Sequence, residues 1–379
     1  MRWRRRLAYL TAAASAVVGV FGLAAPANAS YTKEPMTLGW SPAGPVHSSA
    51  SGGGVVYVGG KLDGTGGIAA VDAATGNLLW QIPANGDVRA LTLSPDGSRL
   101  YAGGGFSIVD GATHKHLVVI QTADHSIVSP WKGTASGMVR DLVVNGDTLF
   151  VGGAFAKLDG VANKGIGAVN ATTGVRDATF NHVADGDVEG LTLTPTSLLL
   201  VGTFLHIDGQ ARASLASINL SDFSLTSWAP RRFCSCDTFW DVQTDGTWAY
   251  VGASGGGGNF AAINLVTGQQ RWAYVHADGD VQSVFLAGDG KAYLGGHFGT
   301  SIYNVATSHT VVAVTVVAAV DLATGQPDPT FTPKIYKTYP GCWTFTSTPG
   351  ALWVGGDFTG EQQNGSNNHR PYLAAYPGV

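Results

Sequence analysis

Few residues of this sequence stand in patterns that catalysis or metal binding requires. Gly252-Ala253-Ser254-Gly255-Gly256 matches the G-x-S-x-G pattern of a serine nucleophile, but that pattern needs a strand-to-helix turn and no helical periodicity follows it. Asp185-Gly186-Asp187 and Asp278-Gly279-Asp280 offer carboxylates to Ca²⁺, and His114-Lys115-His116 offers two imidazoles to a transition metal. Asp-Gly pairs are typical of tight turns, and the histidine pair suits a solvated strand. We therefore expect no metal site and no cofactor.

The cysteines suggest a structural link. Cys234, Cys236 and Cys342 make an odd number, so at least one thiol is left over unless it pairs between chains. Cys234 and Cys236 can close a small disulfide loop, or one of them can reach Cys342. Either link would hold loops together, and neither indicates catalysis.

Aromatic and basic side chains gather in irregular segments between residues 229 and 369, where we expect a binding site. The candidates there are Arg231, Arg232, Trp240, Tyr336, Tyr339 and Trp343. Aromatic rings stack on sugar rings, and arginines hold hydroxyl or carboxylate groups. The ligand would be a polysaccharide, a cell-wall fragment or a protein.

A repeated phrase shows which elements must position these residues. An aromatic or aliphatic residue followed by Val/Leu/Ala-Gly and a small residue occurs seven times, with its first glycine at Gly59, Gly103, Gly152, Gly202, Gly252, Gly295 and Gly355. The spacings are 44, 49, 50, 50, 43 and 60 residues. Repeats of this length built from short apolar runs are typical of β-propellers.

Each repeat predicts four short antiparallel strands. In the second copy, residues 88–93 and Leu100-Tyr101 flank the turn residues Pro95, Asp96 and Gly97, as in a hairpin. A third run and a Thr-Gly turn follow in most copies, and a fourth run ends in an aromatic residue. The sequence therefore predicts an all-β, seven-bladed β-propeller with four antiparallel strands per blade.

The two ends of the chain suggest how the ring closes. The last repeat stops after its third strand, at residues 372–376, and residues 36–42 match the missing fourth strand. We expect this N-terminal strand to complete the last blade. Closure would remove the exposed edges that an open array leaves.

The repeats resemble two known groups. Val-Gly-Gly-x-Phe, then Asp-Gly, then Leu-Ala-Ala resembles the delta-sixty-type propeller repeat of secreted actinobacterial proteins, most clearly from Val151 to Gly160 and from Val354 to Ala375. Residues 70–80 and 262–272 resemble the tryptophan-docking motif of quinoprotein propellers. The resemblance covers nearly the whole mature chain and implies a propeller, without an assigned activity.

The N-terminus predicts export. Arg2, Arg4, Arg5 and Arg6 are basic, residues 7–23 are almost uncharged, and Ala27-Asn28-Ala29 suits signal-peptide cleavage. We therefore divide the chain into a signal peptide, residues 1–29, and one propeller domain, residues 30–379, that is secreted and extracellular. Removing four arginines changes the net charge from −4 to about −8, which argues against nucleic acid as a partner. We expect no membrane span in the mature chain, and a monomer.

The inner strands bring one more group of side chains together. Their equivalent positions hold His47, Arg89, Arg140, Glu189, Trp240, Gln282 and Thr344, so Arg89 and Arg140 join the candidates at the channel mouth. Loops at one face of a ring commonly bind ligands. We expect a secreted, non-catalytic binding module that holds carbohydrate or protein at blades five to seven.

Two alternatives remain open from the sequence. One is an extracellular assembly scaffold. The other is a polysaccharide hydrolase or lyase, which needs two carboxylates across a cleft. The acidic candidates are Asp237, Asp241, Asp357 and Glu361, but two of them fall inside predicted strands.

Overall fold

The computed structural model describes residues 30–254, 259–272, 275–306, 311–336, 341–368 and 370–379. The predicted signal peptide lies outside these residues. Strands and turns make up the described part, which contains no helix long and apolar enough to cross a membrane.

Antiparallel sheets follow one another along the described chain, and each begins with the strand that we call its inner strand. The first four sheets are β1 (Val46–Gly52), β2 (Val55–Gly60), β3 (Gly67–Asp72) and β4 (Leu78–Pro83); β5 (Val88–Leu93), β6 (Arg99–Gly104) and β9 (Leu117–Gln121); β10 (Met138–Asn145), β11 (Thr148–Ala154) and β14 (Ile166–Asn170); and β15 (Val188–Leu193), β16 (Ser197–Gly202) and β19 (Leu215–Asn219). The next three are β20 (Phe239–Thr244), β21 (Trp248–Ala253), β22 (Asn259–Asn264), β23 (Val275–Ala277) and β26 (Ile302–Asn304); β24 (Val281–Leu286), β25 (Lys291–Gly296) and β27 (Val317–Asp321); and β29 (Cys342–Thr348), β30 (Ala351–Gly356) and β33 (Leu373–Pro377).

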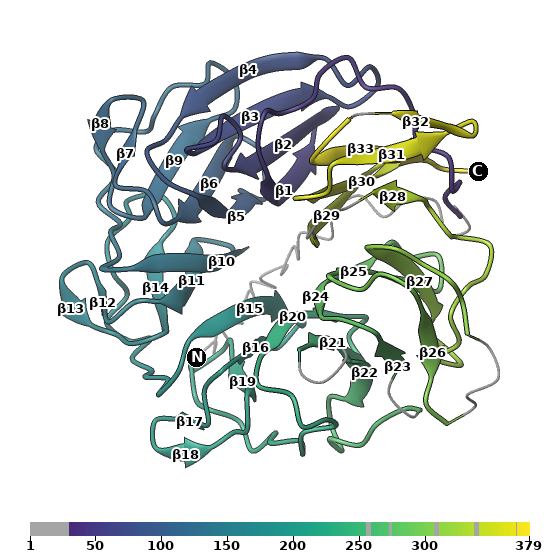
Figure 1. Cartoon of the computed structure of the whole chain (residues 1–379). Helices are drawn as coiled ribbons and strands as arrows, with labels where there is room; N and C mark the ends of the chain where they lie inside the picture. Colours follow the sequence, from purple (N-terminus) through teal and green to yellow (C-terminus); the bar gives the residue numbers. More distant parts are fainter. Residues whose placement is uncertain (1–29, 255–258, 273–274, 307–310, 337–340, 369) are drawn as a thin grey trace, which may run out of the picture.

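Short hairpins extend several loops that follow the second strand. They are β7 (Ile108–Val109) with β8 (Ala112–Thr113), β12 (Lys157–Leu158) with β13 (Val161–Ala162), and β17 (His206–Ile207) with β18 (Gln210–Ala211). These hairpins stand at the periphery of the molecule (Figure 1). A small three-stranded sheet joins β28 (Ile335–Tyr336), which precedes β29, to the hairpin of β31 (Gly360–Gln363) and β32 (Ser366–Asn368), which follows β30.

The Thr-Gly turns end the third strands as the sequence predicts. The Asp72 carboxylate accepts hydrogen bonds from the Thr75 amide at 2.8 Å and the Thr75 hydroxyl at 2.7 Å. Gly76 takes a φ of 67°, which costs a glycine little because it has no Cβ. The same turn recurs where Asn170, Asn264 and Asp321 take the place of Asp72.

The sheets surround a common centre, with β1–β4 next to β29–β33 (Figure 1). Each inner strand contacts the inner strand of the next sheet, and β29 contacts β1. Ser49 and Thr344 form a hydroxyl–hydroxyl hydrogen bond of 2.7 Å across that junction, and the Ser51 hydroxyl donates to the Ser347 carbonyl at 2.6 Å.

Glycines in the second strands let neighbouring sheets approach closely. A Cβ at Gly103 would lie 2.4 Å from Cγ1 of Val139, a fully buried residue of the next inner strand. Gly59 faces Val88 and Gly355 faces Val46 in the same way. Real Cβ atoms do not tolerate such distances, so these glycines set how closely the sheets pack.

Two features differ from the sequence prediction. The repeat pattern aligns Gly202 with the first glycine of the other copies. In the fourth sheet, however, Val201 pairs with Gly190 and Gly202 pairs with Val188, so Gly202 occupies the position of the second glycine. Fourth strands are also shorter than expected. In the first sheet β4 forms a full ladder with β3. In the second, third, fourth and sixth sheets an isolated bridge stands in place of this ladder, and the fifth sheet has such a bridge between Ile263 and Gln270.

The N-terminal segment is not a regular strand, which corrects the prediction for residues 36–42. The Met36 amide donates to the Ala375 carbonyl at 2.8 Å, so the segment does lie beside β33. The Gly39 and Trp40 amides donate instead to the carbonyls of Thr75 and Gly76. The segment cannot continue a ladder with β33 because its amides are divided between two sheets.

The close approach of the sheets makes two matched variants informative. We expect Gly103→Ala to lower the free energy of unfolding by about 2 kcal/mol, because its Cβ would overlap buried Val139. Gly105→Ala would meet only the flexible end of Met138 and should cost much less. Thermal denaturation of both variants checks this, and equal losses of stability would contradict it.

Candidate functional site

A β-bulge near the start of each inner strand builds the centre of the molecule. The pairing register shifts by one residue in all seven inner strands, and the residue left out of the register lines the central pocket. These bulge residues are His47, Arg89, Arg140, Glu189, Trp240, Gln282 and Trp343. A bulge redirects one side chain out of the pleat, so the repeated bulge gathers seven side chains around one axis.

The sequence prediction is wrong by one residue in the last of these positions. Thr344 pairs with Gly355 in the register, and the bulge residue is its neighbour Trp343. Trp343 was selected independently, as an aromatic residue of the last third of the chain.

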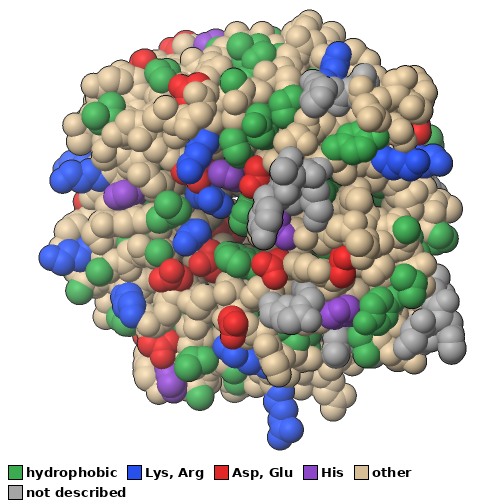
Figure 2. All heavy atoms as spheres, viewed as in Figure 1, with side chains coloured by type: hydrophobic (Ala, Val, Ile, Leu, Met, Phe, Trp, Pro, Cys, Tyr) green, Lys and Arg blue, Asp and Glu red, His purple; other side chains and the backbone are tan. Residues whose placement is uncertain are grey.

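The bulge residues surround a polar pocket of about 320 Å³. Figure 2 shows acidic, basic and histidine side chains gathered around the hollow at the centre of the face. Leu91, Leu142 and Phe345 line the pocket together with buried carboxylates. We call this pocket the channel mouth.

Trp343 connects side chains from four other sheets across the channel mouth. The Arg89 guanidinium lies 5.0 Å from the centre of the Trp343 ring, and the indole Nε1–H donates to the Asp357 carboxylate at 2.7 Å. Edge-to-face ring contacts join Trp343 to His47, Trp240 and His297. Such contacts hold an aromatic ring in one orientation.

Ion pairs hold the charged bulge residues. Asp87 contacts Nδ1 of His47 and Nε of Arg89, each at 2.6 Å. Burial raises the pKa of Asp87, but the hydrogen bond and charge of His47 and the charge of Arg89 outweigh this effect and leave the pKa below its usual value. Burial also raises the pKa of Glu189. The charge of Arg140, whose Nε lies 3.5 Å from Oε2 of Glu189, offsets this rise only in part.

Three polar atoms at the channel mouth have no hydrogen-bond partner within the described residues. They are Nε of Arg140, Nε1 of Trp240 and Oε1 of Gln282. The Gln282 amide nitrogen lies 3.0 Å from Nδ1 of His297. Buried polar atoms are rarely left unpaired in folded proteins, so these atoms make the channel mouth a candidate binding site.

Two buried carboxylates join neighbouring inner strands below this ring. Oδ2 of Asp141 accepts the Leu191 amide proton, and Oδ2 of Asp241 accepts the Val284 amide proton, each at 2.7 Å. Burial raises the pKa of Asp141 to about 7 and that of Asp241 to about 6, although the amide donors oppose the shift. Asp141 was not selected from the sequence, where nothing separates it from other strand residues.

A sequence profile of the family described as "Outer membrane protein assembly factor BamB" matches residues 64–340, well over half of the chain. The chain belongs to this family. The profile match supports the resemblance to quinoprotein-like propellers. The narrower resemblance to the delta-sixty-type repeat stays a prediction. No curated protein matches the chain in sequence.

Solved structures share the fold of this BamB-family chain. The WD40 β-propeller domain of Doa1 is 11% identical, with a TM-score of 0.57 over 92% of this chain and 97% of that one. The computationally designed Ika8 protein is 12% identical, with a TM-score of 0.54 over 91% and 99%. Identities this low show the fold alone, which is an all-β propeller.

The structure distributes the other predicted site residues over separate places. Arg231 and Arg232 line a second groove of about 850 Å³, beside Trp228 and residues 265–270. The Tyr336 hydroxyl donates to Asn367 within the β28–β31–β32 sheet. Tyr339 lies outside the described residues. Arg89, Arg140, Trp240 and Trp343 therefore share the channel mouth, and Arg231, Arg232 and Tyr336 do not join them there.

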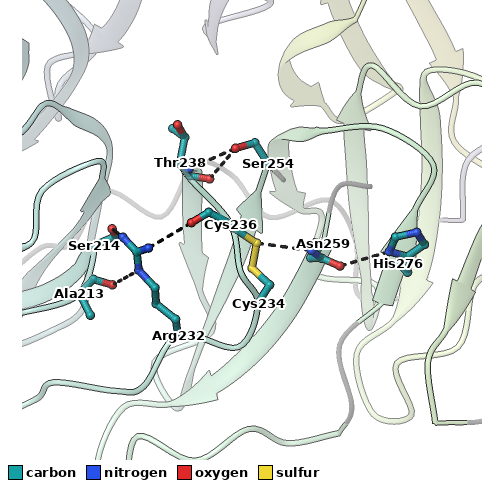
Figure 3. The surroundings of a disulfide bond; sticks show 9 residues. All are labelled: Ala213, Ser214, Arg232, Cys234, Cys236, Thr238, Ser254, Asn259 and His276. Carbon is teal, nitrogen blue, oxygen red and sulfur yellow. Dashed lines mark hydrogen bonds between the residues drawn. A yellow bond between two sulfur atoms is a disulfide. The ribbon is translucent and has the colours of Figure 1, made fainter. Parts of the chain in front are cut away.

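The cysteines and metal candidates have clear positions. Cys234 and Cys236 form a disulfide (Figure 3). Cys342 is a buried free thiol. Within the described residues no group of three or more His, Cys, Asp or Glu side chains could hold a metal ion. Asp185 and Asp278 accept turn amides from the loops that follow the second strands.

The buried aspartates predict a pH dependence of stability. The folded chain keeps a proton on Asp141 up to about pH 7, whereas the unfolded chain releases it near pH 4. The free energy of unfolding should therefore fall as the pH rises through this interval. We expect Asp141→Asn to flatten this slope between pH 4.5 and about 7.5, since the amide does not titrate. Thermal denaturation against pH tests this.

The control is Asp110→Asn, which changes an exposed turn residue. It should leave the slope unchanged. If the free energy of unfolding of Asp141→Asn fell with pH as steeply as that of the natural chain, this would contradict the raised pKa of Asp141.

Proposed function

We propose that this protein is an exported, non-catalytic β-propeller that binds a segment of a partner polypeptide at its channel mouth. The observation that carries the proposal is the polar lining of a pocket of about 320 Å³. Within the described residues, Nε1 of Trp240 and Oε1 of Gln282 have no hydrogen-bond partner there, and Nε of Arg140 has only its ion pair with Glu189. A polypeptide offers both carbonyl acceptors and amide donors. A pocket of this size suits one or two side chains.

The proposal includes a closed wheel of seven blades formed by residues 30–379. The chain of contacts between inner strands, together with the hydrogen bonds from β1 to β29, supports it. Export and an extracellular location rest on the signal-like residues 1–29 alone. We take the wheel to be a monomer.

A protein partner suits the channel mouth better than a carbohydrate. Sugars stack on open aromatic faces, but the Arg89 guanidinium lies over the ring of Trp343. The family description, which names an assembly factor, also favours a protein partner.

The carboxylates argue against the alternative of a hydrolase or lyase. Asp241 accepts the Val284 amide proton, and Asp357 accepts from the Gly341 amide and the Trp343 indole. Groups held by structural donors are poorly placed to transfer protons to a substrate. Glu361 is buried, and burial raises its pKa to about 8.

An assembly scaffold with an unused channel is the second candidate function, and the family description favours it equally. The two candidates differ in whether the channel mouth takes part in binding.

Titration of the mature chain with synthetic peptides and soluble oligosaccharides separates these candidates, with intrinsic tryptophan fluorescence as the readout. We expect peptides to bind and Arg140→Gln to weaken binding about tenfold, because the channel mouth loses a guanidinium whose Nε makes no hydrogen bond to the described residues. Arg231→Ala, outside the channel mouth, is the control and should bind as the natural chain does.

Peptide binding that is unchanged in Arg140→Gln would contradict the placement of the site. Binding of oligosaccharides but not of peptides would show that the ligand is a carbohydrate and not a polypeptide. The absence of any binding would favour the scaffold.

A further inference from the structure

The Cys234–Cys236 disulfide lies in the segment that leads into the inner strand β20, and its two ends differ in accessibility. Cys236 is 1% exposed, whereas Cys234 is only partly buried. The two residues flank Ser235, with Cα atoms 5.2 Å apart. An incoming thiolate would therefore reach the sulfur of Cys234 first.

The buried sulfur has a hydrogen-bond donor of its own. Nδ2 of Asn259 donates to Sγ of Cys236 at 3.4 Å (Figure 3). Oδ1 of Asn259 lies 3.3 Å from Nδ1 of His276, which holds the amide in this orientation. A donor aimed at sulfur stabilises the thiolate more than the disulfide, because only the thiolate is charged.

A guanidinium group lies at the same residue. Nη1 of Arg232 donates to the Cys236 carbonyl at 3.2 Å, and Nη2 donates to the Ser214 hydroxyl at 2.6 Å (Figure 3). These bonds hold the backbone of Cys236 in place beside the donor that its sulfur receives from Asn259. Cys236 is thus both the less accessible sulfur and the one whose surroundings suit a leaving thiolate.

We propose that Cys234–Cys236 is a reversible thiol–disulfide exchange site for dithiols, a property independent of the channel mouth. A thiolate of the dithiol attacks Sγ of Cys234, forming a mixed disulfide while the bond to Sγ of Cys236 breaks and its electron pair stays on Cys236.

The second thiol of the dithiol then displaces Cys234 and closes a disulfide in the dithiol. The two protons of the dithiol end on Cys234 and Cys236, and its two electrons reduce the protein disulfide. The reverse sequence oxidises a dithiol. Cys342 takes no part, since burial raises the pKa of its thiol to about 12.

The test reduces the folded mature chain with dithiothreitol and labels it with iodoacetamide, then unfolds it and labels the remaining thiols with N-ethylmaleimide. We expect Cys234 to take the first label and Cys342 only the second, because buried Cys342 reports unfolding. Asn259→Ala should slow the reduction about tenfold, because the leaving thiolate loses its donor. Asn367→Ala, on a separate hairpin, is the control.

The proposal would be overturned if iodoacetamide labelled Cys234 only in molecules in which it also labelled Cys342. That result would show that the disulfide is reduced only when the chain unfolds. Equal rates in Asn259→Ala and Asn367→Ala would overturn the role of Asn259. Should Asn259→Ala fail to fold, Asn259→Asp keeps the shape, and its carboxylate should slow the reduction at least as much.

Discussion

The structure depends on how the inner strands of neighbouring sheets meet. In the part of the chain that the structure describes, no backbone ladder joins one inner strand to the next; side chains make these contacts instead. A buried valine fits against a glycine of the preceding sheet, as Val139 does against Gly103. Asp141, Asp241 and Ser283 then bond to the backbone of the following sheet. Packing and a few buried hydrogen bonds, rather than continuous pairing, therefore set the arrangement of sheets.

The same arrangement produces the candidate site. Inner strands that lie side by side around an axis leave little room at the centre, and a bulge in each turns one side chain toward it. The bulge residues pair with one another in part, through Asp87 with His47 and Arg89. Arg140 pairs with Glu189, whereas Trp240 and Gln282 each keep a polar atom without a hydrogen-bond partner in the described residues. The site is thus a consequence of the repeat, and its chemistry comes from the different side chains that stand at the bulge position.

The sequence predicted the repeat well because glycine spacing and Thr-Gly turns reflect local backbone needs. It placed Arg89, Arg140 and Trp240 at equivalent positions for the same reason. It failed where pairing rather than local pattern decides: Gly202 and Thr344 are each one residue out of register. Nor could it show that Arg232 bonds to Ser214 and Cys236, because those contacts depend on how two loops fold together.

Contact between the first and last sheets is the claim on which the proposed wheel depends. The most direct test is the double variant Ser49→Cys with Thr344→Cys, whose native hydroxyl oxygens are 2.7 Å apart. Under mild oxidation, peptide mapping of the folded chain should find a disulfide between residues 49 and 344. Both new thiols remaining free in the folded, oxidised chain would contradict the closed arrangement.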